Sequence, residues 1–199
     1  MTYDYLDQVL SEAIPATRSV FQQAKQARIA VDELNIVGQT KRIYEKINDI
    51  AANAFREIAE WYYESEPHGD GMFEYLWVKD LLSTPSQTAK YAWDAEMLRK
   101  RDRLTESLLA TGRNQKEYTT AMRLYIRMLG WFGIEVADEA IRRAREDDGV
   151  THVMWVSEGD SRVCDHCDEL DGQIFLLRAV PPKPHPGCRC HLERVSPDG

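Results

Sequence analysis

The stretch of residues 39–64, QTKRIYEKINDIAANAFREIAEWYYE, decides the main part of the fold. Its apolar residues recur at steps of three and four, at Ile43, Ile47, Ile50, Ala54, Ile58 and Trp61. That spacing places them on one stripe of an α-helix, and a stripe of this width has to be buried. We therefore expect a long helix that packs against other helices.

Helical patterns continue on both sides of this stretch. Residues 4–34 carry a looser stripe, in which Pro15 is expected to kink or break the helix. A loop at residues 66–71 and a short helix at residues 72–82 follow. Thr84, Pro85 and Gln87 form an N-terminal capping pattern that predicts a helix running to Thr111.

The last helix of this region is expected to begin near Asn114 and to end at residues 147–149. Gly112 can close the helix before it. Gly130 and Gly133 mark a potential break within the last helix, because glycine is a poor helix former.

Composition limits the function classes. Of the 199 residues, 43% are hydrophobic, which is enough for a buried core, and the net charge is −8. Residues 149–199 hold five basic and eight acidic side chains. Neither this C-terminal region nor the rest of the chain offers a broad basic surface for nucleic acid. The first residues do not resemble a secretory signal, and no apolar run approaches the roughly 18 residues of a membrane helix.

The residue composition changes after Gly149. Residues 151–157 and 172–176 are rich in β-forming residues, whereas residues 181–187 contain four prolines. We expect a mainly α fold, with a helical body at residues 1–149 and a small α+β module at residues 150–199.

All four cysteines lie in this module. Cys164 and Cys167 have the two-residue gap of a zinc knuckle. Cys188 and Cys190 are two positions apart, so in an extended segment both project to one face. His185 competes with Cys190, since it also has a two-residue gap to Cys188. These five candidates exceed the four positions of a tetrahedral site, and either Cys190 or His185 is the one left out; His166 and His191 rank below them.

A protein made in a reducing cytoplasm uses cysteines more often as metal ligands than in disulfides. A module of some 50 residues buries little surface, so a metal ion would supply stability that it lacks. A closed, sulfur-rich ligand set leaves no position for a reactive water, which predicts one structural zinc ion. The alternative is a pair of disulfides or unliganded thiols.

The module resembles the C-terminal region of phage Mu F-like minor head proteins. The resemblance rests on Trp155-Val156-Ser157, the segment 160–164 (DSRVC), Cys167, the segment 170–175 (LDGQIF) and the closing segment 185–190 (HPGCRC). It covers about residues 150–195. It implies that the five candidate ligands belong to the family motif and that Trp155, Asp160 and Gly172 support them, with Trp155 as a core anchor.

The resemblance also implies a function. A protein of this family is expected to be a non-enzymatic minor capsid or head-morphogenesis component that associates with the portal, in several copies, inside the phage head. It would assist assembly, DNA packaging or DNA delivery. Major capsid or scaffold proteins are further candidate partners, packaged DNA is a weak one, and no membrane is involved. The protein would be made in the host cytoplasm and end in the virion.

Other functions remain as alternatives. A zinc-stabilised nucleic-acid-binding adapter could use a local patch of Arg162, Arg178, Lys183, Arg189 and Arg194. A metal-dependent nuclease or a deaminase is the enzymatic alternative, but the deaminase pattern of His-x-Glu with Pro-Cys-x-x-Cys is absent. The basic run at residues 99–103 and the aromatic residues near Trp61 are interpreted as a solvated helix face and as helix packing.

Overall fold

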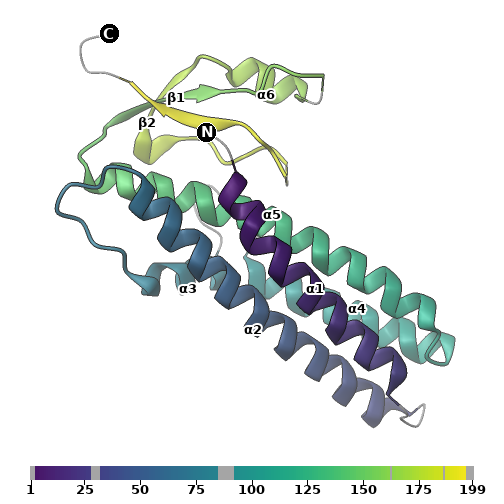
Figure 1. Ribbon diagram of the computed structural model, residues 1–199. Coiled ribbons are helices and arrows are strands. Elements are labelled where there is room, and N and C mark those ends of the chain that lie inside the picture. Colours follow the sequence, from purple (N-terminus) through teal and green to yellow (C-terminus); the bar gives the residue numbers. More distant parts are fainter. Residues whose placement is uncertain (1–2, 28–31, 85–91, 162, 186, 196–199) are drawn as a thin grey trace.

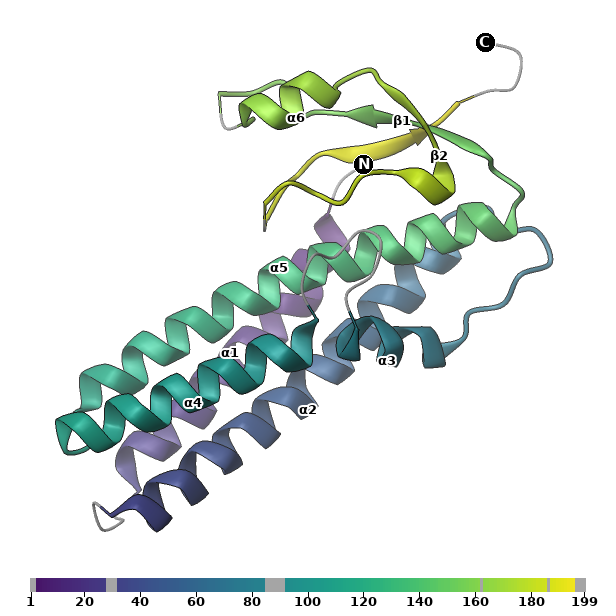
Figure 2. The ribbon, with the colours of Figure 1, turned by 180° about the vertical axis from the view of Figure 1, so that it is seen from behind.

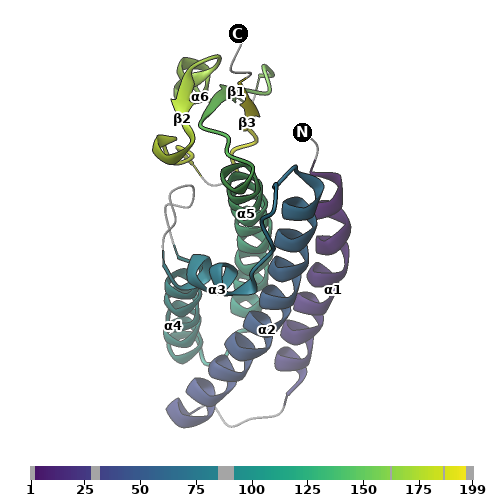
Figure 3. The same cartoon turned by 90° about the vertical axis from the view of Figure 1, so that its left-hand side faces the viewer.

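The computed structural model describes residues 3–27, 32–84, 92–161, 163–185 and 187–195. In these residues α1 (Asp4–Gln26), α2 (Glu33–Ser65), α4 (Trp93–Thr111) and α5 (Gln115–Asp147) lie along one another as a bundle. The short α3 (Tyr75–Ser83) packs against α2 and α4 (Figures 1 and 3). The mainly helical fold is thereby confirmed.

The stripe predicted for α2 forms the centre of the bundle core. Ile43, Ile47 and Ile58 are buried in it together with Phe55. Trp61, which the same spacing placed on the buried stripe, is instead 42% exposed. It lies at the edge of the stripe, where its ring stacks on Tyr5 of α1.

The predicted break in α5 was wrong, and of the two alternatives at Pro15 the break into two helices does not occur. α1 continues through Pro15, because Leu10, Ala13 and Thr17 are buried on either side and hold the helix in place against the local cost of proline. α5 continues through Gly130 and Gly133. A side chain at Gly133 would meet the Leu6 side chain, so glycine here permits the close approach of α1 and α5.

The helix ends near residues 111–114 agree with the sequence. Gly112 caps α4 in the left-handed conformation, with φ 65°, and the Asn114 side chain accepts a hydrogen bond from the Lys116 amide at the start of α5. The capping pattern at Thr84, Pro85 and Gln87 lies mostly outside the described residues. Within them, α3 ends at Ser83 and α4 begins at Trp93.

The C-terminal module contains a three-stranded antiparallel sheet in the order β2-β1-β3. The strands are β1 (His152–Val156), β2 (Ile174–Leu176) and β3 (His191–Arg194). Helix α6 (Asp165–Leu170) and a 3-10 turn, η1 (Leu177–Ala179), lie between them in the sequence. The sequence predicted β1 and β2, whereas β3 and α6 were not predicted.

The module rests on the C-terminal half of α5, close to the start of α1 (Figures 1 and 2). Arg145, buried near the end of α5, donates to the Leu192 carbonyl of β3 and to the Glu66 carboxylate at the end of α2. Among the described helices, none is both long and apolar enough to cross a membrane.

Candidate metal centre

The first half-site lies at the start of α6. Cys164 is the residue that precedes the first turn, and Cys167 lies on that turn and is buried. The Cys164 sulfur accepts hydrogen bonds from the backbone amides of Cys167 and His166, which lower the pKa of this thiol. Amides that point at a sulfur stabilise its thiolate form, and the thiolate is the form that binds metal.

The second half-site lies on the segment that leads into β3. The Cys188 amide donates to the His185 carbonyl at 3.3 Å, and Gly187 takes a left-handed φ of 74°. This turn brings the Cys188 sulfur back toward α6, while Cys190 follows just before β3. Burial raises the pKa of the Cys188 thiol to about 11, although Lys183 and the Cys190 amide favour its charged form.

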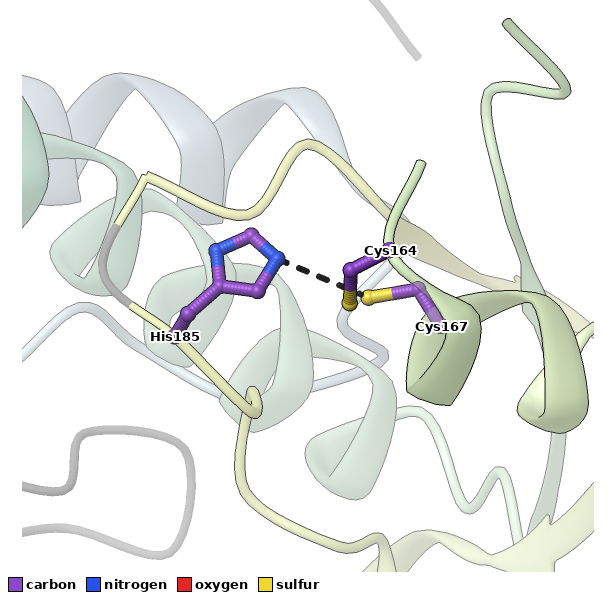
Figure 4. Close-up of side chains that lie close together, drawn as sticks. All are labelled: Cys164, Cys167 and His185. Carbon is purple, nitrogen blue, oxygen red and sulfur yellow. Dashed lines mark hydrogen bonds between the residues drawn. The ribbon is translucent and has the colours of Figure 1, made fainter. Parts of the chain in front are cut away.

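The two half-sites meet at Cys167. Its sulfur lies 3.4 Å from the Cys188 sulfur and 3.9 Å from Nε2 of His185. Cys164, Cys167 and His185 form one group, and Cys167, Cys188 and Cys190 form another, with all ligand atoms of a group within 4.8 Å of one another. Figure 4 shows the His185 ring pointing toward the sulfurs of Cys164 and Cys167.

These distances fit a metal ion. Ligands of tetrahedral zinc with Zn–S bonds of about 2.3 Å lie roughly 3.8 Å apart. Burial, together with hydrogen-bonding contacts to the three other thiols, raises the pKa of the Cys167 thiol. A bound cation would reverse that effect, because it stabilises the thiolate. The described cysteines are all free thiols, with no disulfide among them. The cluster can therefore hold a metal ion, with its ligands drawn from the five predicted residues.

The three predicted supporting residues are linked to the cluster, directly or through a neighbouring residue. Trp155 of β1 is buried in the module core. The Asp160 carboxylate accepts two hydrogen bonds from Arg189, at 2.7 and 2.8 Å, and so ties the loop before Cys164 to the residue between Cys188 and Cys190. Gly172 takes φ 73°, and its amide donates to the Trp155 carbonyl.

Sequence reasoning missed the residues that join this cluster to the helical body. Lys183, two positions before His185, is buried and forms an ion pair with Asp138 of α5. Trp131 of α5 lies against Gly187. The sequence held one signal for the Lys183–Asp138 ion pair, which is a single lysine among prolines in a module with more acidic than basic residues.

The lower-ranked histidines are not part of either ligand group. The His166 side chain is 57% exposed and pairs with Glu169. His191 lies at the start of β3, beside Glu158 and Glu193.

The described basic residues of the proposed local patch all form ion pairs. Arg178 pairs with Glu146, Lys183 with Asp138, Arg189 with Asp160, and Arg194 with Glu66 and Asp148. Arg162 lies outside the described residues. Each described member of the patch is therefore matched by a carboxylate.

Residues 101–193 match the model of the family described as Phage Mu protein F like protein. The match begins within α4 and ends in β3, so it includes the whole cysteine cluster and all of α5. It confirms the family resemblance carried by the cysteine motifs. No characterised protein and no solved structure gave a significant match to the chain.

Proposed function

We propose that this chain, whose residues 101–193 carry the Phage Mu protein F like pattern, is a non-enzymatic minor component of a phage head that associates with the portal during assembly. The observation that carries the proposal is the extent of the match. The matched residues include helices of the body as well as the cysteine module. In the structure, contacts of Arg145 and Lys183 link these same two parts. The matched residues therefore span both the body and the module.

The cysteine cluster would hold a single zinc ion with a structural role. It would draw four ligands from Cys164, Cys167, His185, Cys188 and Cys190. The ion links α6 to the segment before β3, two parts of the module that otherwise share a small apolar core. The helical body then presents the surface that contacts the portal, and capsid or scaffold proteins are secondary candidates.

The alternatives receive less support from the site. A catalytic zinc keeps one position for water or substrate, whereas two ligand groups that share Cys167 offer this cluster five candidate ligands for four positions. A nucleic-acid-binding adapter needs unpaired basic groups on one surface. The described basic side chains of the module are each matched by a carboxylate, which favours a protein partner.

The proposal is tested by co-expression with the portal protein encoded by the same phage. We expect the two proteins to purify together at moderate salt and to separate only when the body is altered. A body variant such as Trp61→Ala, at an exposed aromatic position, is matched with Ile174→Ala, an exposed position on the module. Failure of the wild-type protein to purify with portal protein or to occur in purified heads would refute the proposal. Turnover of DNA by the purified chain would favour the nuclease alternative.

A further inference from the structure

The helical body and the C-terminal module have separate apolar cores. The module core gathers around Trp155, Cys167 and Leu177, and the body core lies between the long helices. Charged groups and a cavity of about 30 Å³ lie between the two, next to Asp138, Trp155 and Lys183. Interfaces within one chain that consist largely of polar contacts allow the two parts to move relative to each other.

Lys183 connects the ligand segment to the body across this interface. Its ammonium group pairs with the Asp138 carboxylate of α5 and lies 3.4 Å from the Tyr3 hydroxyl, just before α1. The same group donates to the Cys188 carbonyl at 3.1 Å. One buried cation therefore contacts α5, the start of α1 and the backbone of a candidate metal ligand.

A second contact lies on the same segment. A Cβ atom at Gly187 would be 3.1 Å from the Trp131 ring, so the backbone of Gly187 lies directly on α5. Lys183 and Gly187 thus touch the body at two points, close in sequence to the candidate ligands His185 and Cys188.

We propose that metal binding at the cysteine cluster controls the docking of the C-terminal module on the helical body, through Lys183. This inference rests on the metal site of the proposed function. A bound ion fixes Cys188 and with it the carbonyl that Lys183 contacts. When the ion is lost, the ligand segment loosens, and hydration of Lys183 and Asp138 competes with their buried pairing. The module then separates from α5 and from the start of α1.

The test is hydrogen exchange measured by mass spectrometry on the full chain, first as purified with zinc and then after chelation. Metal content is measured on the same samples. We expect chelation to speed exchange roughly tenfold or more, both in the ligand segment and in the part of the body that it covers, around residues 3–10 and 131–142. Exchange at the far end of the bundle, around Gly112, should stay the same.

Two variants separate docking from metal binding. Lys183→Met with Asp138→Asn replaces the ion pair without leaving a buried charge alone, and should keep one zinc while it speeds exchange at residues 3–10 and 131–142. Arg178→Ala, which removes an exposed ion pair at the same interface, is the matched control and should change neither.

The outcomes distinguish the two proposals. A chain that binds zinc but shows unchanged exchange in the body after chelation overturns the coupling and leaves the metal site standing. The coupling is equally overturned if the double variant keeps body protection at the wild-type level. A chain that binds no metal overturns both the metal site and the coupling.

Discussion

Arg145 and Glu66 form a two-pronged ion pair that joins the end of α5 to the end of α2. The guanidinium donates through Nε and Nη2 at 3.0 and 3.1 Å, and its third nitrogen donates to the Leu192 carbonyl at 2.8 Å. Both side chains are largely shielded from water. One arginine thereby holds two helices and a strand of the module together.

Arg145→Ala should therefore be strongly destabilising. The substitution leaves the Glu66 carboxylate and the Leu192 carbonyl without their main partner, and loss of one member of a buried pair costs about 3–5 kcal/mol. Urea unfolding followed by circular dichroism measures the change. Lys41→Ala, which removes an exposed pair with Glu45, is the control and should cost less than about 0.5 kcal/mol. Equal effects of the two substitutions would contradict the role of Arg145.

Cys167→Ser should abolish stoichiometric zinc binding, because both candidate ligand groups contain Cys167. Native mass spectrometry should find one zinc in the wild-type chain and none in the variant. His166→Ala is the matched control, since this histidine is next to Cys167 in sequence but exposed and outside both groups. Retention of zinc by Cys167→Ser, or its loss from His166→Ala, would refute the ligand assignment.

The two glycines of α5 should respond differently to alanine. Gly130 has open space where a Cβ would lie, so Gly130→Ala should stabilise the protein by about 0.5–1 kcal/mol through helix propensity. At Gly133 a Cβ would lie 2.6 Å from Cδ1 of Leu6. Gly133→Ala should therefore lose this gain, because α1 has to shift. Thermal unfolding of the two variants side by side provides the comparison, and a larger gain at Gly133 would contradict the packing of α1 on α5.

Glu135 should make stability depend on pH. Burial, with a further contribution from Asp138, raises the pKa of Glu135 to about 8. The unfolded chain releases this proton near pH 4.3, so between about pH 4.3 and pH 8 the folded state retains a proton that the unfolded state has lost. This contribution to stability therefore decreases as the pH rises through that window.

Glu135→Gln removes this contribution, and its stability relative to wild type should increase from about pH 5 to about pH 8. Urea unfolding at the two pH values measures the difference. Glu60→Gln, at an exposed position of α2, is the control and should show no such trend. The same trend in both variants would show that net charge is the cause.

Much of the fold could be predicted from the sequence because its signals are local. The three- and four-residue spacing in α2 and the caps at Gly112 and Asn114 each depend on a few neighbouring residues. The failures have tertiary causes. Pro15 and Gly133 do not break their helices, because contacts with other helices compensate or require a residue of that size. β3 has too few residues for a recognisable pattern and is a strand because it pairs with β1.

The same distinction between local signals and tertiary contacts applies to the candidate site. The five ligand candidates could be found from cysteine and histidine spacing alone, and the structure brings all of them to Cys167. Lys183, Asp138 and Trp131 could not be found, since their importance lies in contacts between residues far apart in the chain. Spacing indicates which residues can bind an ion, but it carries no information about what the ligand segment rests on.

The proposed function is tested most directly by an asymmetric reconstruction of the head of the phage that encodes this protein. We expect several copies inside the shell at the portal vertex, each with the long helical bundle against the portal and the cysteine module on the C-terminal half of α5. Purified heads without the protein, or density for it only away from the portal vertex, would refute the proposed function.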